Sequence, residues 1–202
     1  MKRHGTGGGT WSTRAKFLTA FLTRPGTVGA ITPSSRFLAK EMIRGVDLGP
    51  GARIAEYGPG TGAFTRAILD SIDPNATFFA VERDERLAAE LRARYPGLHL
   101  HVASVEAIES LCKEEGVEQL DPIISGLPWA SFPSALQRRI LDATVRVLKP
   151  GGRLITFGYY VGLLTPAGRR FAALLPEYFS RVERAGPVWR NAPPAFVLRC
   201  TR

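Results

Sequence analysis

Cysteine is scarce in this sequence. Of the 202 residues only Cys112 and Cys200 are cysteines, and their wide separation matches no metal-ligand spacing. This scarcity excludes the disulfide-rich secreted domains and the small zinc proteins. We therefore expect a protein of a reducing compartment, and we predict no metal site.

Long apolar runs are also missing. No stretch approaches the ~20 consecutive apolar residues that cross a bilayer. Residues 1–10 are charged and rich in glycine, and no apolar core of a secretory signal follows them. We expect the protein to stay inside the cell.

Acidic residues are absent from the first 40 positions, although the whole chain contains 18 of them against 27 lysines and arginines. The formal net charge is +9. A basic surface attracts polyanions, which here means nucleic acid or an anionic lipid leaflet, and charge alone does not choose between them. The basic residues of this N-terminal arm are Lys2, Arg3, Arg14, Lys16, Arg24, Arg36 and Lys40.

The length accommodates one α/β domain with short terminal additions. Residues 1–10 are predicted to be a flexible tail, because four glycines leave nothing to bury. Residues 11–48 are predicted to form an amphipathic helix over 11–24 and a second helix, capped by Ser34 or Ser35, that stops near Gly45. Residues 49–202 are predicted to be a single domain.

Strand and helix patterns alternate through most of that domain. Such alternation indicates right-handed crossovers and a mostly parallel sheet with helices on both faces. The last third differs, because two strand patterns follow one another there and predict an antiparallel hairpin. The predicted strands are 53–57, 77–82, 99–103, 122–125, 153–158, 178–184 and 195–200, and the predicted helices are 63–72, 85–95, 105–114 and 134–148.

The most informative stretch is the turn after the first strand, EYGPGTG over residues 56–62. Glycines there allow a tight turn and a close approach of backbone to ligand, and the following helix presents free amides. Gly58, Gly60 and Ala63 also fit the dinucleotide pattern, with Glu82 about 20 residues further on, so a nicotinamide site must be considered.

Two carboxylates favour a different cofactor. Glu56 precedes the first glycine by two positions, where it would repel a pyrophosphate but attract the ammonium group of a methionine moiety. Glu82 can accept hydrogen bonds from ribose hydroxyls. The whole string resembles motif I of the Rossmann-like methyltransferases, which implies S-adenosylmethionine as cofactor and S-adenosylhomocysteine as product. The predicted cofactor-binding residues are Glu56, Gly58, Gly60, Gly62, Glu82, Ser104 and Ser125.

Two of these positions depart from the pattern of such methyltransferases. Ser104 stands at the end of the third strand, where an Asp often lies beside the adenine amine, and Glu106 is a possible substitute. After the fourth strand, Ser125-Gly126-Leu127-Pro128-Trp129 resembles motif IV of amine methyltransferases. Members that act on nucleic acids usually begin this motif with Asn or Asp, so Ser125 and Gly126 count against RNA.

Over nearly its whole length the chain resembles the bacterial phospholipid N-methyltransferases, which act on phosphatidylethanolamine, with a related branch that acts on ornithine lipids. The resemblance implies a Rossmann-like fold and an aminolipid acceptor. It rests on Phe17, Leu18, Phe21 and Leu22 in the first helix, on VGAITPSS over 28–35, on the glycine turn, on SGLP over 125–128 and on NAPPA over 191–195.

The reaction implied by this resemblance turns an amine into a bulkier cation. Aromatic faces stabilise such cations, so Trp129, Tyr159 and Tyr160 are candidates for a cage around the head group, which Tyr57 could join. Tyr159, Trp129 and Ser125 are the predicted catalytic residues. No residue is an obvious general base, because His99 and His101 alternate on a predicted strand and are expected to be structural.

The first helix has the composition of an interfacial helix, with an aromatic-rich apolar face beside basic residues. We expect a cytoplasmic enzyme bound peripherally to the inner face of the cell membrane, whose partners are an anionic membrane surface and its aminolipid substrate. No obligate protein partner is evident. The predicted substrate and membrane contacts are Trp11, Arg14, Lys16, Phe17, Phe21, Arg24, Trp129 and Tyr160.

The alternative is an rRNA adenine N-methyltransferase, which shares the fold and the basic charge. Nucleic acid is therefore a less favoured but open partner. The sequence leaves open whether the acceptor is phosphatidylethanolamine or ornithine lipid, how many methyl groups are transferred, and the oligomeric state.

Overall fold

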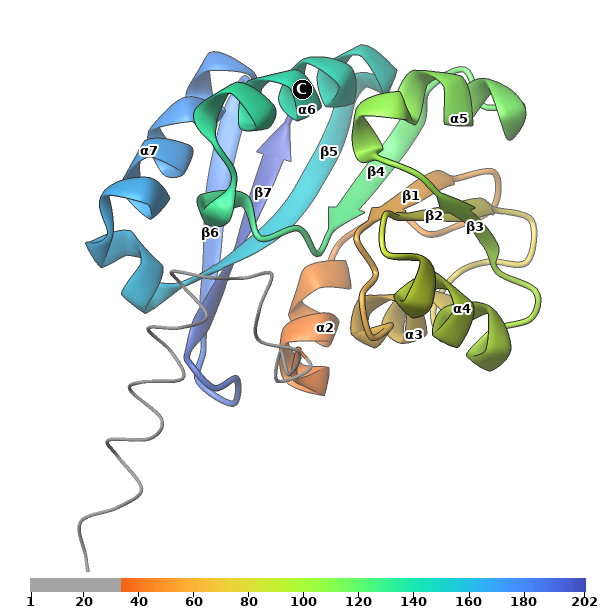
Figure 1. Cartoon of the computed structure of the whole chain (residues 1–202), viewed down its shortest axis with the longest axis horizontal. Helices are drawn as coiled ribbons and strands as arrows, with labels where there is room; N and C mark the ends of the chain where they lie inside the picture. The colour runs from red at the N-terminus through yellow and green to blue at the C-terminus, as the bar shows by residue number, and fades with distance from the viewer. Residues whose placement is uncertain (1–33) are drawn as a thin grey trace, which may run out of the picture. The chain divides into compact units, whose positions relative to one another are not determined.

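The computed structural model describes residues 34–202. Their centre is a seven-stranded sheet in the order β3-β2-β1-β4-β5-β7-β6 (Figure 1). Strands β1 to β5 pair in parallel, and β7 pairs antiparallel with both β5 and β6. The strands are β1 Arg53–Tyr57, β2 Thr77–Glu82, β3 His99–Val102, β4 Leu120–Ser125, β5 Leu148–Tyr159, β6 Arg181–Val188 and β7 Ala195–Thr201.

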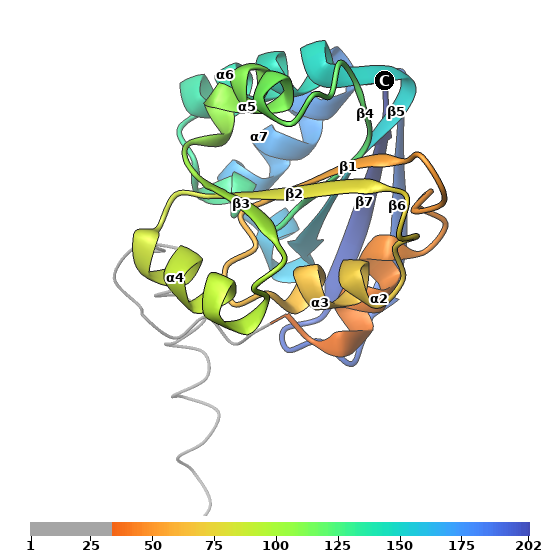
Figure 2. The same ribbon diagram turned by 90° about the vertical axis from the view of Figure 1, so that its right-hand side faces the viewer.

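Helices cover both faces of the sheet, as Figure 2 shows edge-on. One face carries α2 (Arg36–Ile43), α3 (Ala63–Leu69) and α4 (Glu85–Arg94), and the other carries α5 (Ile108–Glu114), α6 (Ser134–Val147) and α7 (Pro166–Leu174). Buried side chains alternate along β1, so that Ile54 packs in the cluster of α2 and α3 while Ala55 packs in that of α5 to α7. The predicted Rossmann-like α/β fold with an antiparallel hairpin is confirmed.

Local signals placed several elements correctly. Ser35 caps α2, because its hydroxyl accepts a hydrogen bond from the Leu38 amide (3.2 Å). Strands β1 and β2 have the predicted bounds. The predicted helix 105–114 begins as a 3-10 turn over Val105–Ala107 and continues as α5. The predicted amphipathic helix 11–24, the tail and the residues named in them lie outside the described part of the chain.

Helix α7 was not predicted. Thr165 caps it by accepting from the Gly168 amide (3.0 Å), and Pro166 occupies its first turn. Gly168 interrupts the apolar pattern, and a β-carbon there would lie 2.2 Å from the Gly162 carbonyl oxygen. The threonine-proline start is the signal that could have identified this helix.

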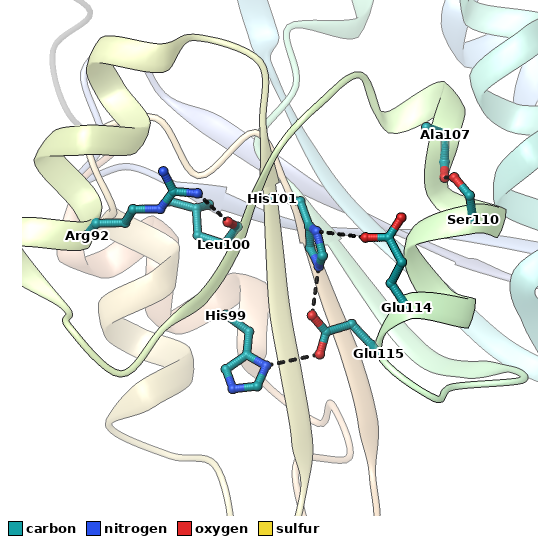
Figure 3. A network of polar contacts seen from close by, with 8 residues as sticks. All are labelled: Arg92, His99, Leu100, His101, Ala107, Ser110, Glu114 and Glu115. Atoms are coloured by element: carbon teal, nitrogen blue, oxygen red, sulfur yellow. Dashed lines mark hydrogen bonds and ion pairs between the residues drawn. The ribbon is translucent and has the colours of Figure 1, made fainter.

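The two histidines of β3 are structural, as predicted. His101 contacts Glu115 of the α5 end through Nε2 (2.7 Å), and His99 contacts the same carboxylate through Nδ1 (3.0 Å), as Figure 3 shows. Burial raises the pKa of Glu115, but the hydrogen bonds from the two histidines outweigh it and hold that pKa below its usual range. On the other side Arg92 donates to the Leu100 carbonyl (2.9 Å), so the edge strand is fixed to both α4 and α5.

Two kinds of feature are absent from the described residues. No helix within 34–202 is long and apolar enough to cross a membrane. Over the same residues, no group of three or more His, Cys, Asp or Glu side chains could hold a metal ion.

Candidate cofactor and acceptor site

The glycine turn lies at the carboxyl edge of the sheet, between β1 and α3. Gly58, Gly60 and Gly62 have φ angles of 62°, 55° and 83°, a left-handed region that other residues rarely adopt. A β-carbon on Gly62 would also lie 2.8 Å from the Leu91 Cδ2 atom. All three glycines are therefore required by the backbone conformation of the turn. A β-carbon on Gly60 would meet no atom within 4 Å, so the turn borders open space at that position.

Glu82, at the end of β2, holds this turn in place. Its Oε2 atom accepts from the Gly60 amide (3.0 Å), and its Oε1 atom accepts from the Asp84 amide (2.9 Å). The side chain is buried, with 8% of the residue exposed. A carboxylate oxygen can accept more than one hydrogen bond, so Glu82 retains acceptor capacity for a ligand hydroxyl beside the turn.

Glu56 is the most unusual group of the site. It is completely buried, and its Oε2 atom accepts from the Thr65 hydroxyl (2.7 Å). Its Oε1 atom is buried without a hydrogen-bond partner among residues 34–202. Burial raises the pKa of Glu56 to about 8. A buried carboxylate with an unpaired oxygen is costly, and an ammonium group is the kind of ligand that removes this cost.

The segment after β4 packs directly on the glycine turn. The Gly126 amide donates to the Tyr57 carbonyl (2.7 Å), and a β-carbon on Gly126 would lie 2.5 Å from the Gly58 carbonyl oxygen. In return, a β-carbon on Gly58 would lie 2.7 Å from the Leu127 Cδ2 atom. The glycine turn and the segment after β4 are therefore in tight contact. This contact explains why position 126 is a glycine. From the sequence alone, Gly126 was only part of a departure from the usual Asn or Asp.

Ser125 and Trp129 contact each other inside the protein. The Trp129 indole nitrogen donates to the Ser125 hydroxyl (3.0 Å), and the Leu127 amide donates to the same oxygen (3.4 Å). The Trp129 ring stacks on Phe171 of α7 with a centroid distance of 5.1 Å. Ser125 is 0% exposed and Trp129 is 2% exposed. Trp129 thus lies in the core, because its indole finds both an acceptor and a ring there, and not on the open face expected of a cage residue.

Replacing Ser125 by alanine is expected to lower the free energy of unfolding by about 1–3 kcal/mol, because the buried indole N–H loses its acceptor. At about 2–4 °C per kcal/mol for a chain of this size, the melting temperature should fall by several degrees. The matched control is Ser110→Ala, because the Ser110 hydroxyl is exposed on α5, where it donates to the Ala107 carbonyl. Equal melting temperatures for the two variants would contradict this role of Ser125.

Ser104 and Glu106 are occupied by local contacts. Ser104 caps the 3-10 turn before α5 by accepting from the Glu106 amide (3.3 Å). Glu106 accepts from the Arg139 guanidinium of α6 (2.6 Å), which holds the pKa of this exposed carboxyl below its usual range. Glu106 is thus directed toward α6, and a role beside an adenine stays a prediction.

The two tyrosines at the end of β5 are half-buried at the carboxyl edge. Tyr159 packs edge-on against Phe157 (centroid distance 5.6 Å), and burial raises the pKa of its hydroxyl. Tyr160 packs edge-on against Phe196 (5.2 Å). Tyr57, in contrast, is completely buried, and its hydroxyl oxygen accepts from Thr144 (3.5 Å). The structure therefore leaves Tyr159 and Tyr160 as candidate head-group contacts and places Tyr57 in the core.

Two segments far apart in the sequence meet beside these tyrosines. The Ser35 amide donates to the Asn191 side-chain oxygen (3.0 Å), and the Asn191 side-chain nitrogen donates to the Pro193 carbonyl (2.8 Å). The Tyr160 amide donates to the Pro194 carbonyl (3.2 Å). Asn191 is buried, and the segment 191–194 thus connects the start of α2 to the residue that follows β5. In the sequence, these segments were only two separate motifs of the family resemblance, and no local pattern indicated that they meet.

The likeness to known proteins agrees with this site. A family described as "Methyltransferase domain" matches residues 54–152, which include the glycine turn. The chain is 31% identical over 187 residues to an ornithine lipid N-methyltransferase of Singulisphaera acidiphila, and the match covers 91% of this chain and 93% of that relative. It is 33% identical over 110 residues to a ribosomal RNA small subunit methyltransferase A of Prosthecochloris aestuarii, covering 54% of this chain and 40% of that relative.

Solved structures show the same fold at low identity. An S-adenosylmethionine-dependent O-methyltransferase from Thermotoga maritima superposes with a TM-score of 0.61 at 19% identity, covering 87% of this chain and 67% of that one. Fibrillarin from Aeropyrum pernix, solved with natively bound S-adenosylmethionine, superposes with a TM-score of 0.59 at 12% identity, covering 82% and 74%. Together with the nearly full-length match, the glycine turn and its two carboxylates show that the chain belongs to the class I S-adenosylmethionine-dependent methyltransferases, in the family that includes the ornithine lipid N-methyltransferase.

Proposed function

We propose that this enzyme methylates the amine head group of a membrane lipid, either an ornithine lipid or phosphatidylethanolamine and its methylated derivatives. The observation that carries the proposal is the extent of the similarity to the lipid enzyme, which spans almost the whole of both chains. The similarity to the rRNA enzyme covers less than half of that protein.

The residues present fit S-adenosylmethionine. The unpaired oxygen of Glu56 is the proposed acceptor for the ammonium group, and Glu82 is the proposed acceptor for ribose hydroxyls. Gly58, Gly60 and Gly62 let the backbone approach the ligand without side chains. When bound, S-adenosylmethionine supplies a methyl group on a positively charged sulfur.

The proposed binding site for the methyl acceptor lies at the edge of the sheet where β4 and β5 end. A lipid amine must be unprotonated to act as a nucleophile, and every methyl group it gains makes a bulkier cation. Tyr159 and Tyr160 offer aromatic faces that stabilise such a cation at the edge of the sheet. Ser125 and Trp129 are proposed to act by positioning, because they hold the loop after β4 against the glycine turn.

The proposed location is peripheral, at the inner face of the cell membrane. The contacts expected of Trp11, Arg14, Lys16, Phe17, Phe21 and Arg24 remain predictions, since these residues lie outside the described part of the chain.

Incubation of the purified protein with labelled S-adenosylmethionine tests the acceptor. Vesicles with phosphatidylethanolamine, vesicles with ornithine lipid and total RNA are offered separately, and the labelled products are identified by mass spectrometry. We expect label in a lipid head group, and the product masses give the number of methyl transfers. Label in RNA alone would overturn the proposal.

A further inference from the structure

The turn between β6 and β7 presents a tryptophan to solvent. Trp189 is 73% exposed, which is unusual for the largest apolar side chain. The guanidinium of the next residue, Arg190, lies over the Phe37 ring of α2 at 4.9 Å, and that of Arg36 lies over the same ring at 5.0 Å. Trp189, Arg190, Phe37 and Arg36 are called the tryptophan surface below.

This surface adjoins the carboxyl edge that carries the candidate site. Val188 pairs with Ala195, and Ala195 pairs with Tyr159 at the end of β5. Two strand spacings, about 10 Å, therefore separate the backbone before Trp189 from Tyr159. The 3-10 turn Tyr160–Leu164 continues from that point and ends on Leu164, which is 77% exposed. Figure 1 shows the β6–β7 turn beside α2, beyond the end of the sheet.

The charge around these exposed side chains has one sign. No Asp or Glu occurs over residues 158–176 or 184–202. Arg36, Arg169, Arg170 and Arg190 are all exposed. Within residues 34–202 the ion pairs involve other cationic side chains, so these four guanidinium groups lack a carboxylate partner there. They are available to an anionic partner.

We propose that the tryptophan surface and Leu164 bind the surface of an anionic phospholipid bilayer. Trp189 and Leu164 enter the boundary between head groups and acyl chains, and the arginines contact lipid phosphates. Two large apolar side chains exposed on turns next to the same sheet edge suit the apolar boundary of a bilayer, whereas most contacts to a nucleic acid are made to phosphates and sugars. The inference deepens the proposed function, on which it rests, because docking here would turn the candidate site toward lipid head groups.

Binding of the full-length protein to vesicles without aminolipid tests the surface separately from substrate recognition. The vesicles contain equal parts of phosphatidylglycerol and phosphatidylcholine, and binding is measured by sedimentation. Trp189→Ala is expected to weaken binding about tenfold, because a large apolar contact is lost. The double variant Arg36→Gln, Arg190→Gln is expected to weaken it by roughly tenfold or more, and this loss should shrink at high salt.

The matched controls lie away from this edge. Leu164→Ala is compared with Leu69→Ala, because Leu69 is 37% exposed at the far end of α3. Only Leu164→Ala is expected to weaken binding. Unchanged affinity for S-adenosylmethionine and an unchanged circular dichroism spectrum confirm that each variant is folded.

Two results would overturn the proposed surface, and a third would overturn only the proposed function. Unchanged vesicle binding by Trp189→Ala would overturn the proposed surface, even if lipid in detergent micelles is methylated. Loss of RNA binding by that variant with unchanged vesicle binding would assign the surface to nucleic acid instead. If vesicle binding depends on Trp189 but neither aminolipid is methylated, the surface stands and the proposed function falls.

Discussion

Replacement of Glu56 by glutamine is expected to weaken binding of S-adenosylmethionine by roughly 10- to 150-fold, which corresponds to about 1.5–3 kcal/mol for a hydrogen bond to a charged group. The reason is that Glu56 has one buried oxygen without a partner in the described residues, and an ammonium ligand supplies that partner. Glutamine keeps the shape and the acceptor for Thr65 but loses the charge. Titration calorimetry measures the effect.

The same residue predicts how cofactor binding depends on pH. With a pKa of about 8, Glu56 is mostly protonated at pH 6.5 in the unliganded protein. A cation binds the ionised form, so the proton must leave on binding. Affinity should therefore rise with pH between 6 and 7.5, by up to about tenfold per pH unit. Glu56→Gln should show a nearly flat profile over this range. A wild-type profile as flat as that of the variant would contradict the assignment.

Stability of the unliganded protein should change in the opposite direction. The folded pKa of Glu56 lies above the ordinary value of 4.5, so the folded state holds a proton that the unfolded state has lost between pH 4.5 and about 8. Stability thus falls as pH rises through this window, by on the order of 4 kcal/mol in all. Glu56→Gln should remove this slope, as chemical unfolding at several pH values can show.

The matched control for both measurements is Glu109→Gln. Glu109 is a half-exposed carboxylate that pairs with Arg146 (2.8 Å) on the opposite face of the sheet. Its replacement should change neither cofactor affinity nor the pH slope, because it carries no buried charge.

Gly126→Ala is expected to abolish most of the cofactor binding. The added carbon would lie 2.5 Å from the Gly58 carbonyl oxygen, and neither backbone can move without displacing the glycine turn. Overpacking of this kind costs about 1–3 kcal/mol in stability, and distortion of the turn should reduce cofactor affinity by more than about tenfold. Thermal unfolding and calorimetry measure the two effects.

Gly97→Ala provides the control for Gly126→Ala. A β-carbon on Gly97 meets no atom within 4 Å, and the backbone there does not adopt a left-handed conformation. This substitution should leave both stability and affinity nearly unchanged. Normal cofactor affinity in Gly126→Ala would show that the two motifs do not depend on each other.

Much of the fold could be predicted because its signals are local. Alternating apolar residues identified β1 and β2, and the glycines at 58, 60 and 62 identified the turn, since φ angles that few residues tolerate leave a mark in sequence. Glu56 and Glu82 could be identified as cofactor-binding candidates because each lies at a characteristic distance along the chain from that turn. The predictions of a methyltransferase family and of S-adenosylmethionine as cofactor rested on these residues.

Only the tertiary structure decided which distant residues meet. The order of the strands places Gly126 against Gly58, directs the Trp129 indole inward to Ser125, and joins Asn191 to Ser35 across 156 positions of sequence. It also gathers Trp189 and Arg36 at one edge. A sequence pattern records the conformational preference of a residue and its near neighbours. Contacts across the sheet depend on how the crossovers bring strands together, and no local pattern contains that information.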